Sequence, residues 1–224
     1  MTGPGPTPVI WRRSARARRI SLRLDLRTGA VVLTLPPRAT RAAGQAMLDQ
    51  SAEWIATRVG RLPAPVVLAD GAVIPVHGTA HRVTHHPGGR GIRLGDGALY
   101  VSGDPAFLPR RVTDFLRAEA GRHLGALARA QAAQLGRPVA RIVIKDTRTR
   151  WGSCTARGVL MFSWRLVMAP PWVQAYVVAH EAAHLRHMNH GPAFWALLDT
   201  LTPHRVAAEA WLLVEGPGLL RVDC

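Results

Sequence analysis

The chain has 224 residues, enough to bury the core of one large domain or of two small ones. It contains no run of about 18 apolar residues and only two cysteines, Cys154 and Cys224, which argues against a membrane-spanning protein and against a disulfide-stabilised scaffold. The net charge of +15 comes almost entirely from arginine. Such an excess attracts polyanions, although arginine richness beside many alanines is also typical of a GC-rich genome. We expect a cytoplasmic protein with no membrane partner.

The N-terminal segment predicts a tail followed by a β-hairpin. Residues 1–8 are rich in proline and glycine and are expected to be disordered. Apolar and polar residues alternate over 20–26, Thr28-Gly29 is a turn signal, and 31–35 forms a returning strand. Seven arginines face a single acid, Asp25, in this part of the chain: Arg12, Arg13, Arg16, Arg18, Arg19, Arg23 and Arg27. Two interpretations stay open for them, a solvated surface and a contact with nucleic acid.

The next segments predict a helix and a small sheet. Thr40 caps a helix that ends before Pro63, with Trp54 on its buried side. Short apolar runs broken by glycine turns over 66–104 indicate a small antiparallel sheet. Three histidines in this region have no partner at metal-ligand spacing, so we expect them to be exposed: His81, His85 and His86.

Asp104-Pro105 is a plausible internal boundary, and a long amphipathic helix follows it and ends before Gly136. Two strands, 139–145 and 159–167, are joined by 146–158 and are expected to pair as a hairpin. The second of them is the predicted edge for aligning an extended peptide. Helices at 192–201 and 203–213 precede a loose tail that starts at Gly216.

The sequence His180-Glu181-Ala182-Ala183-His184 places two imidazoles one helical turn apart, where both can reach one metal ion. Pro170-Pro171 opens this helix, and Val173 and Val177 continue the stripe of the two histidines. A carboxylate beside the first ligand can act as general base on a zinc-bound water. Surface histidines on an ordinary amphipathic helix are the alternative interpretation.

Two residues could supply a third ligand. His187 lies seven residues after His180, about 10 Å along a straight helix and too far for one ion. His190 can reach back if the helix stops near Met188-Asn189, since Asn tolerates a left-handed stop and Gly191-Pro192 prevents regrowth. We therefore predict His190 as the third zinc ligand and keep His187 as a candidate for oxyanion stabilisation or for a role behind the ligands.

A family resemblance rests on these residues together with several others. They are Arg150-Trp151-Gly152-Ser153-Cys154, Trp164-Arg165-Leu166-Val167, Ala169-Pro170, the histidine helix through Leu185, Asn189-His190 and Phe194-Trp195. The combination resembles the YgjP-like metallopeptidase family, and the segment after Asn189 also looks like the third-ligand block of SprT-type and WLM metalloproteases. The resemblance implies a zincin-like fold, with His180, His184 and His190 on zinc and Glu181 as base.

We accordingly predict an α+β zincin-like metallopeptidase with an antiparallel sheet packed on the active-site helix. The expected organisation is a tail at 1–8, a β-rich region with one helix at 9–104, a catalytic unit at 105–214 and a tail at 215–224. The expected cofactor is Zn²⁺ and the expected substrate a peptide or unfolded protein. The alternatives are Cys154 as a nucleophile, a basic nucleic-acid-binding protein with a structural zinc, and a protease recruited to nucleic acid.

Overall fold

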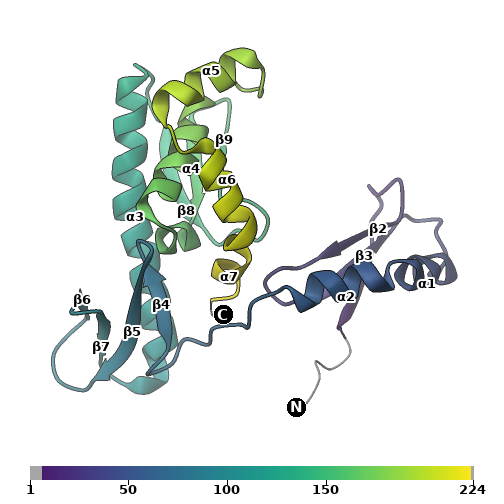
Figure 1. Ribbon diagram of the computed structural model, residues 1–224, viewed down its shortest axis with the longest axis horizontal. Coiled ribbons are helices and arrows are strands. Elements are labelled where there is room, and N and C mark those ends of the chain that lie inside the picture. Colours follow the sequence, from purple (N-terminus) through teal and green to yellow (C-terminus); the bar gives the residue numbers. More distant parts are fainter. Residues whose placement is uncertain (1–6, 223–224) are drawn as a thin grey trace. The chain divides into compact units, whose positions relative to one another are not determined.

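The computed structural model describes residues 7–222 and has a mixed α+β architecture (Figure 1). The chain divides into two compact units, Met1–Ala64 and Pro65–Cys224, here called the N-terminal and C-terminal units. Most of the tail expected at 1–8 lies outside the described residues. The division precedes the boundary expected at Asp104, because the strands before Asp104 share one hydrophobic core with the helices after it.

The N-terminal unit is a three-stranded sheet covered by two helices. Its strand order is β1-β3-β2, with β1 at Val9–Arg13, β2 at Ser21–Leu24 and β3 at Val31–Leu35. The predicted hairpin of β2 and β3 is confirmed, and Gly29 in its turn has a φ of 74°. Strand β1, which pairs parallel to β3, was not predicted.

The helix predicted after Thr40 forms in two parts, α1 (Arg41–Gln50) and α2 (Ala52–Gly60), with the break at Ser51. The Thr40 hydroxyl accepts the backbone N–H of Ala43, which confirms the cap. The prediction of a buried Trp54 is wrong: this side chain is 43% exposed and the Arg58 guanidinium lies over its ring. Adjacent helical residues point about 100° apart, so Ile55 can pack on the sheet while Trp54 faces solvent.

The C-terminal unit begins with a four-stranded sheet of order β4-β5-β7-β6. Its strands are β4 (Val73–Val76), β5 (Thr79–His86), β6 (Ile92–Gly95) and β7 (Ala98–Ser102). The expected antiparallel sheet is mixed instead, since β5 and β7 pair in parallel. The reason is that the tight β6–β7 hairpin returns β7 to the centre and leaves β6 at the edge.

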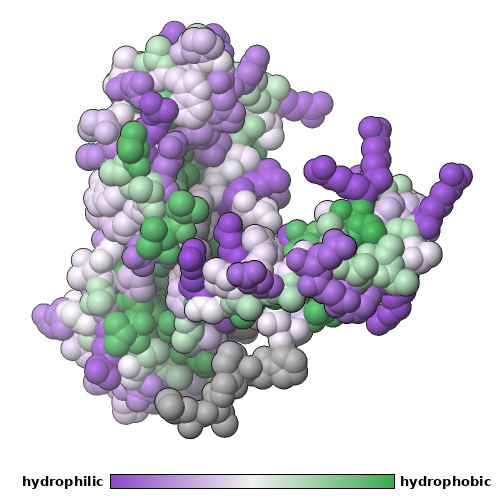
Figure 2. All heavy atoms as spheres, turned by 45° about the vertical axis from the view of Figure 1, so that its right-hand side comes forward, coloured by the Kyte–Doolittle hydropathy of each residue, from purple (hydrophilic) through white to green (hydrophobic). Residues whose placement is uncertain are grey.

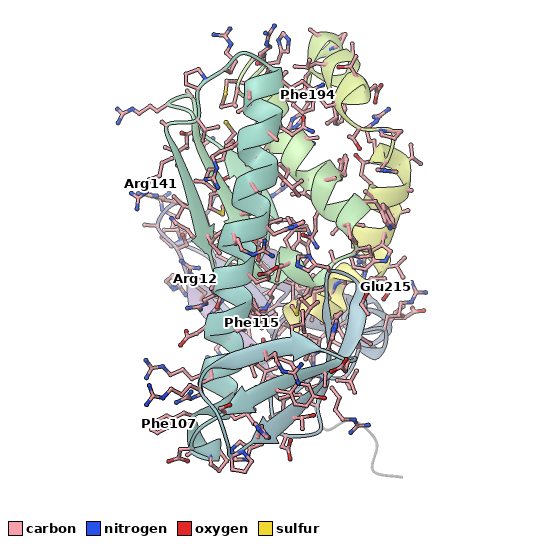
Figure 3. All side chains as sticks on the ribbon, turned by 90° about the vertical axis from the view of Figure 1, so that its left-hand side faces the viewer. Arg12, Phe107, Phe115, Arg141, Phe194 and Glu215 are labelled. Carbon is pink, nitrogen blue, oxygen red and sulfur yellow. The ribbon has the colours of Figure 1, made fainter. Side chains whose placement is uncertain are left out.

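The predicted long helix is confirmed as α3 (Leu108–Gln134), which follows the short helix η1 (Pro105–Phe107). Phe107, the residue directly before α3, is exposed, whereas Phe115, further along the helix, is partly buried against the core (Figure 3). The buried side of α3 packs on the short helix η2 (Trp164–Met168) and on α4 (Pro171–Ala183), which lies beside it in Figure 1. This pairing fixes the position of the helix that carries the histidines.

The second sheet of this unit has the order β8-β10-β9, with β8 at Arg141–Lys145, β9 at Gly152–Cys154 and β10 at Val159–Ser163. The expected hairpin of the first and last of these strands is wrong, because β8 and β10 are parallel. The hairpin is formed by β9 and β10 around a turn that ends at Gly158, whose φ is 73°. Strand β10 is therefore central, and β9 forms an edge of the sheet.

Three further helices close the unit: α5 (Pro192–Leu201), α6 (Arg205–Val214) and α7 (Gly216–Leu220). The tail expected at 215–224 is ordered up to Val222, because Leu219 and Leu220 are buried and Val222 bridges to Val66. Within residues 7–222, no helix combines the length and the apolar character needed to cross a membrane.

Candidate metal centre

His180 lies in the last turn of α4, and His184 is the C-cap residue that follows it. Pro171 occupies the first turn of that helix, where its missing N–H needs no partner, and Val173 and Val177 are buried one and two turns before the histidines. The stripe predicted from the sequence therefore forms. Its polar end is the histidine pair, whose ring centroids are 5.2 Å apart.

His190 joins this pair because α4 stops early. The helix ends at Ala183, several residues before the stop predicted at Met188-Asn189, and the left-handed conformation predicted for Asn189 is absent. The His184 side chain accounts for the early stop: its Nδ1 is 2.9 Å from the backbone oxygen of His187, which holds the chain in a tight turn. The chain then reverses before α5 and brings the third imidazole back to the first two.

The ring nitrogens of His180, His184 and His190 all lie within 4.8 Å of one another. The Nε2 atoms of His180 and His190 are 3.1 Å apart, close to the roughly 3.4 Å between two nitrogens of one tetrahedral zinc with Zn–N bonds of about 2.1 Å. A carbonyl oxygen only accepts, so His184 carries its proton on Nδ1 and presents the Nε2 lone pair. Among residues 7–222, this is the only group of three or more such ligands close enough for one ion.

The electrostatic environment favours the neutral, metal-binding form of His180 and His184. Burial, helped by the neighbouring His184 and His190, lowers the pKa of His180 to about 4. Burial also lowers the pKa of His184 and outweighs the opposing hydrogen bond to His187. Phe194, at the start of α5 (Figure 3), packs against all three rings at centroid distances of 4.6 to 5.1 Å. Three converging imidazoles are a donor set that fits zinc.

The imidazole of His187 does not belong to the ligand group. Its contribution to the centre is the backbone oxygen that receives the Nδ1 proton of His184. That contact fixes the tautomer and the ring orientation of a candidate ligand. The exclusion of His187 as a neighbouring donor agrees with the distance argument made from the sequence.

Glu181 is buried beside this group, 7% exposed, and packs against the backbone of β9. A Cβ atom added to Gly152 would lie 2.5 Å from the Glu181 Cγ, so only glycine allows the strand to approach this closely. Burial raises the pKa of Glu181 to about 7, against the opposing charge of Arg150. The carboxyl is thus poised to exchange a proton near neutral pH.

Cys154 ends the same strand but has the wrong chemistry for a nucleophile. Burial, helped by the charge of Glu181, raises the pKa of its thiol to about 11. Reactive cysteines need the thiolate, which this environment disfavours. Cys154 is therefore unsuited to act as the nucleophile of this site.

A cavity of about 430 Å³ adjoins His180 and Glu181. Two of its residues were not predicted: Tyr176, one turn before His180, and Glu209 on α6. The Tyr176 hydroxyl donates to Glu209 Oε1 at 2.7 Å, and burial together with this bond raises the pKa of the phenol. Tyr176 lies four residues before His180 on the same helix, so the sequence could have predicted that it faces the site. Nothing in the sequence connects Glu209 to the site. The rest of the lining is Arg150, Gly152 and four apolar side chains: Trp151, Val177, Leu212 and Leu213.

The sequence of this chain also matches a known protein family. Residues 18–214 match the family described as YgjP-like, metallopeptidase domain. The chain belongs to the YgjP-like metallopeptidase family. This confirms the resemblance seen in the sequence, and the YgjP-like match extends over parts of both units.

Among solved structures, the YgjP-like chain is similar to the metallopeptidase zymogen abylysin of Pyrococcus abyssi, with 18% sequence identity and a TM-score of 0.37. The match covers 45% of this chain and 97% of the other. No curated protein matches the sequence.

Proposed function

We propose that this protein is a zinc-dependent peptidase in which His180, His184 and His190 hold the metal and Glu181 is the general base. The observation that carries the proposal is the convergence of three imidazoles beside a buried carboxyl. Family membership supports a metallopeptidase. The rival with a structural zinc is not favoured, because such zinc has four protein ligands and the described residues offer three in this group.

The metal, when bound, supplies a Lewis acid that makes water more acidic and polarises a substrate carbonyl. Glu181 accepts a proton from the attacking water and later returns it to the leaving amine. Gly152 keeps the Glu181 side chain in place by packing directly on it. The His187 backbone oxygen keeps His184 in the correct tautomer.

The strand that aligns the substrate is β9 in this proposal. The sequence assigned this role to residues 159–167, but β10 pairs on both sides with β8 and β9 and has no free edge for a peptide. Strand β9 is at the edge of the sheet and packs against α4. A peptide extended along β9 would gain backbone hydrogen bonds and pass beside Glu181.

Two measurements test the proposal together: the metal content of the purified protein and the hydrolysis of an unfolded protein substrate before and after chelation. We expect one zinc per chain, loss of hydrolysis on chelation and its return on adding zinc. A protein that binds zinc and cleaves no peptide bond under any of these conditions would contradict the peptidase function.

A second proposal concerns recruitment to nucleic acid through the N-terminal unit. Residues 7–64 hold eleven arginines and three acidic residues, and hydrophilic side chains project from this unit in Figure 2. Helices α1 and α2 cover one face of the sheet, while Arg12 and Arg23 lie on the other face beside Thr34 and Val32, their partners in β3. Uncovered arginines on one face suit phosphate contacts.

A salt titration of binding to a labelled duplex tests the recruitment proposal. The logarithm of affinity should fall by about 0.9 per phosphate contact for each unit of log salt, and charge reversal at Arg12 and Arg23 should flatten that slope. Variants of the zinc ligands should bind the duplex unchanged. Failure to bind at low salt would assign these arginines to a solvated surface.

A further inference from the structure

A second cavity, of about 390 Å³, reaches the candidate metal centre at His184. Its lining includes three arginines from three separate segments. Arg137 follows the end of α3, Arg157 lies in the turn between β9 and β10, and Arg186 follows the end of α4. No carboxylate lines this cavity, which we call the arginine pocket.

The three guanidinium groups have no ionic partner within the protein. Across residues 7–222, no carboxylate oxygen lies within 4.0 Å of the side chains of Arg137, Arg157 or Arg186. Arg186 is held in place, since its Nε donates to the backbone oxygen of Leu135 at 3.1 Å. A carbonyl does not neutralise the charge. Three positively charged side chains line one cavity that holds no carboxylate, so an anion in the pocket is electrostatically favoured.

Strand β9 connects this pocket to the cavity beside Glu181. Gly152, at one end of the strand, lines the apolar cavity, and Thr155, immediately after the other end, lines the arginine pocket. An extended chain covers about 10 Å over these three residue steps. His180 lines the cavity beside Glu181 and His184 lines the arginine pocket, so the candidate metal centre borders both. A peptide aligned on β9 would therefore present one part to the apolar side chains and another to the arginines, with the bond at the metal centre between them.

Resting on the peptidase function proposed above, we infer that the arginine pocket binds a carboxylate of the substrate. Carboxylates are the anionic groups of an unmodified peptide, and they come from acidic side chains or from the C-terminus. Arginine suits this role because its planar group donates two parallel hydrogen bonds to one carboxylate. The site thus selects peptides that combine an apolar residue with a negative charge across the cleaved bond.

The test uses a set of fluorogenic peptides that differ only in charge. One series replaces Asp or Glu by Asn or Gln, and the other compares a free C-terminus with its amide. We expect the zinc-loaded protein to favour the charged member of one series about tenfold in kcat/KM, the effect of one hydrogen bond to a charged group. The series that shows the preference identifies the source of the carboxylate.

Variants locate the preference. The pair Arg137→Gln with Arg157→Gln should reduce it to about twofold or less, mainly through KM. Arg141→Gln removes the same charge from an exposed side chain at the start of β8 that does not line the pocket (Figure 3), so it should keep the preference. An equal preference in both variants, or none in the unaltered protein, would overturn the inference.

A binding measurement separates this inference from the peptidase function. Glu181→Gln protein is titrated with the charged and uncharged peptides, and their dissociation constants are compared without turnover. Tighter binding of the charged peptide that depends on Arg137 and Arg157, with no cleavage of any peptide by the unaltered protein, would uphold the pocket and reject the peptidase. Cleavage of charged and uncharged peptides at equal rates would uphold the peptidase function and reject the carboxylate pocket.

Discussion

The C-terminal unit contains two groups of histidines that differ in how their ring nitrogens are used. In the second group, His77 Nε2 lies 2.8 Å from Glu119 Oε1, and His77 Nδ1 lies 3.2 Å from Gln174 Nε2. His123 packs on the His77 ring at 4.5 Å between centroids. Both nitrogens of His77 thus have a partner, whereas the Nε2 atoms of His180, His184 and His190 face one another with no carboxylate among them.

This difference separates a cross-link from a binding site. A histidine held between a carboxylate and an amide joins its neighbours and has no lone pair left for a metal. His77 in this way connects the β4–β5 turn to α3 and α4. In the first group burial lowers the pKa of His180 and His184, and the ring nitrogens of these residues and of His190 converge so that one metal ion can bind all three.

The largest effect is expected on removing one converging imidazole. His184→Ala and His190→Ala should each lose tightly bound zinc, and hydrolysis should fall to the level of the metal-free protein, because two ligands do not complete the sphere. His187→Ala should keep its zinc, since only the backbone oxygen of this residue contacts His184. Metal analysis after gel filtration measures the zinc content of each variant. A His187→Ala protein without zinc, beside a His190→Ala protein that retains it, would reverse the ligand assignment.

The next largest effect is expected at Glu181, where a substitution should separate metal binding from catalysis. Glu181→Gln should bind zinc as the unaltered protein does and lower kcat about 10² to 10⁴-fold, because the amide keeps the shape and cannot accept a proton. Zinc content, circular dichroism and kcat are the measurements. An unchanged kcat would remove Glu181 from the mechanism.

A smaller effect is expected from crowding Glu181 without changing it. Gly152→Ala places a Cβ 2.5 Å from the Glu181 Cγ, and displacing a catalytic group by about 1 Å can cost about 10²-fold in rate. Gly121→Ala is the matched control, since its Cβ would meet only Ile144 at an ordinary 3.8 Å. Rates and zinc content are compared for both variants. If Gly152→Ala has normal activity, the close approach of β9 has no part in placing the base.

These tests probe contacts that differ in how far they could be predicted. The ligand triad follows from spacing within eleven residues, so the sequence predicted it even though the helix stops earlier than expected, at Ala183. The contact of Gly152 with Glu181 depends on where β9 lies in its sheet. A three-residue strand is too short to show an alternation of apolar and polar residues, so the pairing of β9 with β10 and its packing on α4 could not be predicted from the sequence.

The arginine pocket and the Tyr176–Glu209 pair show the same limit. Their residues come from segments far apart in the chain, and only the packing of α3, α4 and α6 brings them together. Hydrophobic periodicity predicted the presence of those helices because it is a local signal, although α4 ends earlier than expected. Strand order and side-chain convergence are set by the whole fold, which is why two predicted antiparallel arrangements proved mixed.

The smallest effect is expected in the second histidine group and concerns stability. Burial raises the pKa of Glu119, but hydrogen bonds and charges from Arg122 and His77 outweigh it, so the pKa is lowered overall. A carboxylate with a lowered pKa stabilises the fold above its unfolded pKa, and this contribution is lost as the pH falls through the folded value. Glu119→Gln should therefore lower the free energy of unfolding by about 1 kcal/mol at neutral pH, a modest value because Arg122 is exposed.

Denaturant unfolding of the metal-free protein at several pH values measures the contribution of Glu119. The difference between the unaltered and Glu119→Gln proteins should shrink toward zero in acid, because the protonated Glu119 of the unaltered protein is then uncharged, like the glutamine of the variant. Glu215→Gln, at an exposed carboxylate (Figure 3), should show no such difference at any pH. Zinc content and kcat of Glu119→Gln should stay unchanged. Loss of zinc from this variant would mean that the cross-link around His77 also shapes the metal centre, and the two histidine groups would no longer be separable.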